Sequence, residues 1–347
     1  MKITEILSES LMLETPEEVR SEIIQKISKI QDEPDLINVL KFTNQYAFKK
    51  DVGKLATIKG YRDTVANIIL QAIGNVDAPE SVVRAFLKRL STDGVIKENL
   101  LRTPGMVHSI DAIIDTKFLP IFHAIKRDLY EKIAGKIGEK GDVGKGEYLL
   151  AILSPRIIRR GAPGDVAIDK TKVEIKAGQN GRLGPAGSGD LRGRLDEYFT
   201  VLIKQKLATP QILKGVDTRV FNITAKKMGA FSQVFGNDQR KVSAALEIQL
   251  KMHYPSLNVK PMVKAIVKGG QIDGFAVVQQ MLAASYSVYQ KAKGFDGILV
   301  IDEDITKFLY INTPEAAAAS AGMLSVAFPS FIGSQSDCLK ITLRKRT

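Results

Sequence analysis

Charged residues interrupt the two apolar arms of a predicted β-hairpin at residues 163–178, and this pattern constrains the fold more than any other feature of the sequence. Apolar residues alternate with other residues on both arms, as is typical of paired strands with one buried face. The alternating apolar positions are Val166, Ile168, Val173, Ile175 and Ala177. The turn-forming run from Asp169 to Lys172 joins the arms. The sequence therefore predicts a half-buried antiparallel hairpin.

The apolar alternation also predicts which side chains share a face of this hairpin. Val166 lies on the same face as Val173 only if the loop has an even number of residues, because a three-residue loop slips the pairing by one and reverses the faces. A loop of Lys170-Thr171, or of the four residues 169–172, gives three expected pairs: Ile168 with Val173, Ala167 with Glu174, and Asp165 with Lys176. We therefore expect two carboxylates and one ammonium group to converge on one face.

The composition indicates an ordinary globular protein, with 44% apolar and 25% charged residues among 347. No uncharged apolar stretch approaches the ~18 residues that span a bilayer, and acidic residues interrupt the amino-terminal segment. We expect neither secretion nor membrane insertion, and a cytoplasmic protein. A single cysteine, Cys338, cannot form an intramolecular disulfide or a thiolate zinc site, and the chain has only three histidines. Any metal would therefore be held by oxygen.

The net charge of +12 favours an acidic partner. Nucleic acid is the commonest such partner for a basic protein without a membrane signal. Solvated surface lysines are the alternative interpretation of the same charge.

Two domains are predicted from the local patterns. Residues 1–135 have helical periodicity, with helices expected after Thr15-Pro16-Glu17-Glu18 and after Asp77-Ala78-Pro79-Glu80. The segment 136–145, rich in glycine and charge, predicts a hinge. The second domain, residues 136–347, has a helical insertion at about 179–270.

The second domain continues after the insertion with four further predicted elements. They are a long helix at 275–293, a strand at 298–301 with a partner at 308–311, and two alternating runs at 324–328 and 339–344.

Further charged residues flank the hairpin. Glu147 lies in the first turn of a short predicted helix, where it either stabilises the helix dipole or supplies a third carboxylate to the hairpin face. Arginines precede and follow the hairpin, and those that follow it lie in and next to the glycine-rich segment 178–193. These arginines either bind nucleic-acid phosphates or are solvated. These candidate nucleic-acid-binding residues are Arg156, Arg159, Arg160, Arg182, Arg192 and Arg194.

The charged trio predicts a magnesium site. Two adjacent carboxylates repel each other, and burying them is costly unless a cation neutralises them. Mg²⁺ binds oxygen ligands and is commonly held by one or two carboxylates together with a substrate phosphate, with Mn²⁺ as a substitute. A lysine two residues after a carboxylate can orient the water that such an ion activates.

Glu147, Pro163-Gly164-Asp165 and Glu174-Ile175-Lys176 together resemble the signature of the PD-(D/E)xK nuclease superfamily, over about residues 146–178. The resemblance implies a restriction-endonuclease-like α/β core, a mixed central sheet flanked by helices, that the helix at 275–293 and the strand at 298–301 complete. It also implies that Asp165, Glu174 and the Ile175 carbonyl bind Mg²⁺, that Lys176 positions the attacking water, and that Glu147 is an auxiliary carboxylate. The expected activity is hydrolysis of phosphodiester bonds in DNA, most simply double-stranded DNA, by a monomer or a homodimer.

The short motif alone has low specificity, because Asp115-Thr116-Lys117 also has a carboxylate two residues before a lysine. The apolar strand around Glu174 and the preceding Gly-Asp distinguish the second instance. The alternative function is that of a catalytically inactive nuclease-fold protein that binds nucleic acid or takes part in viral assembly.

Overall fold

The structure, a computed structural model, describes residues 71–96, 100–133, 149–150, 153–154, 156–159, 163–178, 181–222, 228–332 and 336–344. The chain divides into two compact units, Met1–Lys97 with Ile114–Arg159, and Glu98–Ile113 with Arg160–Thr347. Glu147, Arg160, the helix expected after Thr15 and the hinge expected at 136–145 lie outside the described residues. The predicted domain boundary therefore stays a prediction.

The described part of the first unit is mainly helical. It contains α6 (Glu80–Ser91), the 3-10 helix η2 (Thr116–Phe118), α8 (Leu119–Ile133) and the short strand β2 (Ile157–Arg159). Helix α6 begins after Pro79 as predicted, and buries Phe86 against Phe118 in an edge-to-face contact with ring centroids 5.6 Å apart. Arg84, on the opposite face, is exposed.

The second unit is built on a mixed sheet, as the sequence predicts. Its strands run in the order β1 (Val107–Ser109), β9 (Lys307–Ile311), β8 (Gly297–Ile301), β4 (Thr171–Ala177) and β3 (Val166–Ile168). Strands β4 and β8 are parallel, and the other neighbours are antiparallel. Strand β1, followed by the short helix α7 (Ile110–Ile113), lies in a range expected to be helical; His108 is opposite Phe308 in the sheet.

The hairpin β3–β4 has an even loop, as predicted, but its register differs by two residues. Val166 is opposite Val173, so the loop is Asp169-Lys170 rather than the expected Lys170-Thr171 or 169–172. Asp169 has φ +55°, a left-handed conformation that Asp tolerates better than most residues, and this lets the two-residue turn begin one residue earlier than Lys170. A shift of two leaves the faces unchanged. The pairing ends at Val166, and the Asp165 N–H donates to the Val173 carbonyl, so Asp165 lies beside Val173 and not opposite Lys176 as expected.

A long helix makes the crossover that parallel strands require. Helix α15 (Gly274–Lys293) begins at Asp273, whose carboxylate caps two backbone N–H groups, and ends at Gly294 with φ +74°. Strand β8 follows directly, so the helix and strand predicted at 275–293 and 298–301 are confirmed. Helix α16 (Pro314–Ala319) packs against α15, and the 3-10 helix η4 (Ser320–Gly322) follows it.

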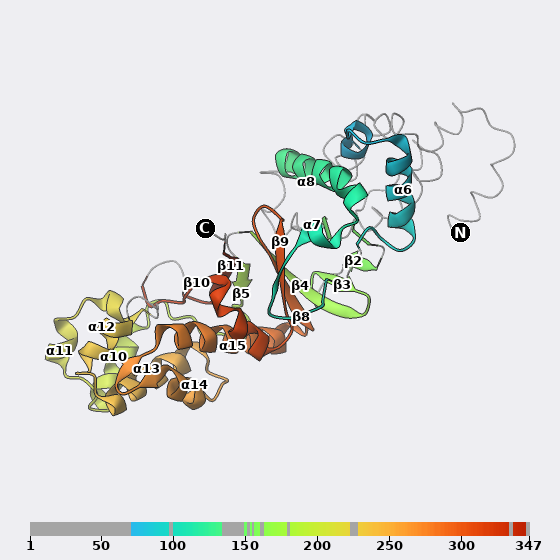
Figure 1. The fold of residues 1–347 in the computed structure, drawn as a ribbon. Helices are drawn as coiled ribbons and strands as arrows, with labels where there is room; N and C mark the ends of the chain where they lie inside the picture. Colours follow the sequence, from blue (N-terminus) through green and yellow to red (C-terminus); the bar gives the residue numbers. More distant parts are fainter. Residues whose placement is uncertain are drawn as a thin grey trace, which may run out of the picture. The chain divides into compact units, whose positions relative to one another are not determined.

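The predicted insertion at 179–270 is mostly helical but begins with a strand. β5 (Gly181–Leu183) pairs with β11 (Leu339–Leu343), which also pairs with β10 (Leu324–Ala327). Helices α10 to α14 gather beside α15 in Figure 1. Their bounds are α10 Leu195–Lys204, α11 Pro210–Lys214, η3 Thr218–Phe221, α12 Met228–Val234, α13 Gln239–His253 and α14 Lys260–Ile266, followed by the two-stranded pair β6 (Val267–Lys268) and β7 (Gln271–Ile272).

Candidate active site

Asp165 lies directly before β3 and reaches across to β4. Its Oδ2 accepts a hydrogen bond from the Ile175 backbone N–H at 2.7 Å, and its own N–H donates to the Val173 carbonyl at 3.0 Å. The first bond uses an N–H of β4 that has no β3 residue left to pair with, because β3 begins at Val166. The carboxylate is thereby fixed at the open end of the hairpin.

Glu174 and Lys176 form a close ion pair on the same face of β4. Lys176 Nζ lies 2.7 Å from Glu174 Oε1 and 3.2 Å from the Tyr289 hydroxyl oxygen. The Tyr289 hydroxyl also donates to Glu174 Oε1. The structure thus places Glu174 and Lys176 together on β4 with Tyr289 of α15, and Asp165 lies near enough to both for their charges to act on it.

The electrostatics of the two carboxylates differ. Burial and the nearby charge of Glu174 raise the pKa of Asp165 above its ordinary value, while the Ile175 N–H, Lys176 and Lys293 oppose this shift. Glu174 instead has an ammonium and a phenol as direct partners. The charge of Glu174 is thus, after burial, the second cause of the raised pKa of Asp165.

The hairpin is more deeply buried than the half-buried pair that the alternation predicts. All three residues of β3 are buried, and the side chains of Glu174 and Lys176 are only 11% and 13% exposed. The expectation failed because β4 is an inner strand between β3 and β8, and Tyr289 of α15 lies over its charged face. The charged groups line an enclosed site rather than an open sheet surface.

The oxygen atoms of Asp165, Glu174 and Ile175 are of the kind that binds a divalent cation. The contacts within the described part of the chain engage Oδ2 of Asp165 and Oε1 of Glu174, which leaves Oδ1 and Oε2 as potential ligands. The Ile175 carbonyl points to the same edge of β4 as its N–H, toward Asp165, because both groups of a strand residue face one side. Among the described residues, however, no group of three or more His, Cys, Asp or Glu side chains could hold a metal ion. A site here would depend on two carboxylates and backbone or substrate oxygens.

The predicted nucleic-acid-binding arginines fall in different settings. Arg156 is exposed in the first unit, and Arg159 lies on β2. Arg182 on β5 pairs with Asp337, and its Nε lies 3.2 Å from the Cys338 sulfur. Arg192 is exposed.

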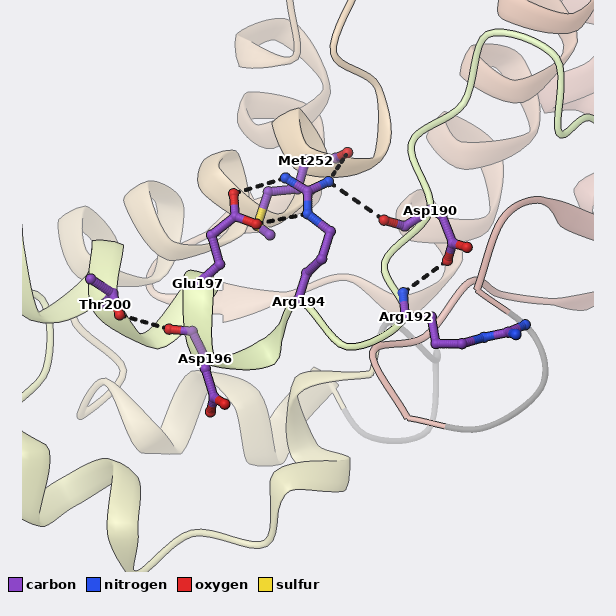
Figure 2. Close-up of polar contacts among 7 residues, drawn as sticks. All are labelled: Asp190, Arg192, Arg194, Asp196, Glu197, Thr200 and Met252. Atoms are coloured by element: carbon purple, nitrogen blue, oxygen red, sulfur yellow. Dashed lines mark hydrogen bonds and ion pairs between the residues drawn. The ribbon is translucent and has the colours of Figure 1, made fainter.

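Arg194 is bound within the protein. Its guanidinium donates two bonds of 2.8 Å to Glu197, in the bidentate geometry of Figure 2, and this contact holds the pKa of Glu197 below its usual value. A surface pocket of about 440 Å³ adjoins it, lined by Arg194, Gln205, Ala244, Glu247, Ile248, Lys251 and Met252. This pocket contains none of the residues of the β3–β4 face.

Some glycines of the segment 178–193 lie against the protein itself, whereas Gly178 and Gly193 adjoin open space. A Cβ on Gly189 would stand 2.2 Å from the Met252 carbonyl oxygen, and a Cβ on Gly181 would stand 2.8 Å from Cβ of Lys176. At Gly181 and Gly189 glycine permits close packing within the protein, a use that was not predicted from the sequence.

Tyr289 is the site residue that the sequence reasoning missed. It is 5% exposed on a helix whose buried residues are mostly apolar. A buried phenol normally has a hydrogen-bond partner, so the placement of Tyr289 on the buried stripe of the predicted helix was an available signal. Its partner could not have been read from the sequence, because 115 residues separate Tyr289 from Glu174.

The Asp115-Thr116-Lys117 motif has a structural role. The Asp115 carboxylate accepts from the Lys117 backbone N–H at the start of η2, and Lys117 Nζ lies 3.6 Å from Asp115 and over the Phe118 ring. This Asp115–Lys117 pair is a helix cap at the surface.

Comparisons with protein-family models, curated proteins and solved structures return no match for this chain. The described helices include none long and apolar enough to cross a membrane.

Proposed function

We propose that this protein is a Mg²⁺-dependent nuclease that hydrolyses phosphodiester bonds of DNA on the β3–β4 face. The observation that carries the proposal is that Asp165 is bound to the Ile175 N–H, between Glu174 and Lys176 in sequence, and interacts with the charges of both residues of this ion pair. The hairpin, the crossover helix α15 and the parallel strand β8 are also the elements that the resemblance to the PD-(D/E)xK superfamily requires.

The donor set supports this assignment. Asp165 and Glu174 would hold the ion with the Ile175 carbonyl. Burial and then the charge of Glu174 raise the pKa of Asp165, and a bound cation would offset both effects. Mn²⁺ has similar oxygen chemistry and would replace Mg²⁺. The chemistry that a bound Mg²⁺ supplies in such a site is Lewis-acid activation of water and of the phosphodiester.

The residues of the chain itself would orient the reactants. Lys176 Nζ, held at Glu174, would donate to the attacking water or to a phosphate oxygen and stabilise the negative charge that develops there. The overall charge of +12 would attract the DNA backbone. Glu147, the predicted auxiliary carboxylate, lies outside the described residues.

The direct test compares two lysines in the same sequence pattern. Purified protein is incubated with plasmid, linear and branched DNA, with Mg²⁺ or with chelator. We expect Mg²⁺-dependent cleavage that Lys176→Met removes and Lys117→Met retains, because Lys117 also forms an ion pair two residues after a carboxylate, but at a surface helix cap. Equal cleavage by the Lys176→Met variant and the wild type would overturn the proposal.

One observation favours a second function, that of a catalytically inactive relative that binds nucleic acid or assists assembly. Lys176 already neutralises Glu174 at 2.7 Å, so this carboxylate is satisfied without a metal. DNA binding without Mg²⁺-dependent cleavage in the same assay would support this alternative.

A further inference from the structure

Tyr289 is placed to act on both charged partners of the candidate site. Lysine is donor-only, so the Tyr289 oxygen accepts the bond from Lys176 Nζ at 3.2 Å. The hydroxyl hydrogen of Tyr289 is then available for Glu174 Oε1, to which Tyr289 donates. Three hydrogen bonds form a closed triangle, and each group in it restricts the other two.

The Tyr289 ring is itself held firmly. It is buried and packs edge-on against Phe295, with centroids 5.2 Å apart. Lys176 Nζ lies 5.0 Å from the centre of the Tyr289 ring, and Gly181 lies close to the Lys176 Cβ. The phenol therefore belongs to a rigid part of the fold, whereas the lysine ends a flexible four-carbon stem.

We propose that Tyr289 is a positioning residue of this site, which fixes the Lys176 ammonium at Oε1 of Glu174. The inference deepens the proposed nuclease function and rests on it for its effect on cleavage. Without the phenol, Lys176 keeps Glu174 as its hydrogen-bond partner but gains rotational freedom. Its ammonium group then spends less time in the position where it can contact a water molecule or a phosphate. Tyr289 acts through Lys176 and Glu174 and needs no contact with the substrate.

Tyr286 provides a matched control on the same helix. It is also buried, and its hydroxyl donates to the Asp296 carbonyl at 3.4 Å instead of to the charged pair. Tyr286→Phe and Tyr289→Phe remove the same atom from neighbouring turns of α15. A difference between these variants therefore reports the specific partners of Tyr289.

The first measurement needs no activity. A double-mutant cycle of Lys176→Met and Glu174→Gln, measured by urea unfolding in chelator, gives the coupling of the ion pair. We expect a coupling of roughly tenfold or more in the unfolding equilibrium constant, retained with Tyr286→Phe and reduced to about threefold or less with Tyr289→Phe. Unchanged coupling in the Tyr289→Phe protein would overturn the inference.

The second measurement uses single variants at saturating Mg²⁺. We expect Tyr289→Phe to lower kcat by roughly 10²-fold with little change in the KM for DNA, since misplacement of a catalytic group affects the chemical step. Tyr286→Phe should match the wild type. A Tyr289→Phe protein with wild-type kcat, or a loss confined to KM, would overturn the positioning role. If the wild type cleaves no DNA, the proposed nuclease function fails, and the coupling measurement alone decides whether Tyr289 fixes the pair.

Discussion

At the scale of single residues, the two carboxylates of the candidate site are stabilised by different means. Glu174 has a lysine and a tyrosine as partners, whereas Asp165 has a backbone N–H and the repulsion of its neighbour. A buried ion pair that loses one partner leaves an uncompensated charge, while a carboxylate with a raised pKa is destabilising when ionised. Neutral substitutions at the two positions should therefore have opposite effects on the metal-free protein.

We predict that Glu174→Gln lowers the free energy of unfolding by about 3–5 kcal/mol, because Lys176 is left buried without its counter-ion. Asp165→Asn should raise it at neutral pH. The folded-state pKa of Asp165 lies above its unfolded value of 3.8. The contribution of Asp165 to the free energy of unfolding is therefore most favourable below pH 3.8, and it is lost as the pH rises through the raised pKa. Chemical unfolding in chelator between pH 4 and pH 8 measures both effects.

The gain from Asp165→Asn should therefore grow with pH. A gain that is independent of pH, or a loss at pH 8, would mean that Lys176 and Lys293 already compensate Asp165. The placement of Glu174 and Lys176 on one face of a strand was predictable from the hairpin pattern. The register was not, because the left-handed conformation of Asp169 lets the turn begin one residue earlier.

At the scale of secondary-structure elements, β4 lies in the main sheet of the second unit and also contacts β5 of the three-stranded sheet. It pairs with β3 and β8, and its Lys176 lies against Gly181 of β5. A Cβ at Gly181 would meet Lys176 Cβ at 2.8 Å and the Ile341 carbonyl oxygen at 3.1 Å. Strand β5 can approach this closely only with glycine at position 181.

We predict that Gly181→Ala lowers the free energy of unfolding by about 1–3 kcal/mol, the usual cost of overpacking. Gly229→Ala on helix α12 is the control, since its Cβ would meet no atom within 4 Å and alanine favours a helix. Thermal unfolding of the two variants makes the comparison. Equal melting temperatures would show that β5 can move away from β4 at little cost.

The elements with strong local patterns were predictable. The hairpin, α15, β8 and β9 occur where the alternation and helix signals indicated. The pairing of β5 with β11 was not predictable, because these strands are far apart in sequence and the residue pattern of a single strand does not specify its partner. The strand character of residues 107–109 was missed for the same reason, since β1 exists only through its pairing with β9.

At the scale of the whole molecule, charge should dominate DNA affinity. A footprint of roughly five phosphates predicts a slope of about −4 to −5 for log K against log salt on duplex DNA. Exposed arginines would contribute to this slope, and an arginine bound to a carboxylate would contribute less, because the ion pair competes with phosphate. Arg192 is exposed, and the guanidinium of Arg194 is bound bidentately by Glu197.

We predict that Arg192→Ala makes the salt slope shallower by about 0.9, the contribution of one phosphate contact. Arg194→Ala should leave the slope unchanged, since its guanidinium is held by Glu197 (Figure 2). Fluorescence anisotropy at several salt concentrations, in Ca²⁺ to limit cleavage, provides both slopes. A larger change with Arg194→Ala than with Arg192→Ala would contradict this assignment.

The parallel pairing of β4 with β8 also has a consequence during synthesis. The Lys172 N–H donates to the carboxylate of Asp296, 124 residues later in the chain. At roughly 5–20 residues per second, a ribosome needs about 6–25 s to make that interval. For that time the nascent hairpin lacks its partner strand, and an unpaired apolar edge is a site of wrong association. The charged side chains of Lys172, Glu174 and Lys176 would then disfavour pairing of the unpaired strand β4 with other chains during synthesis.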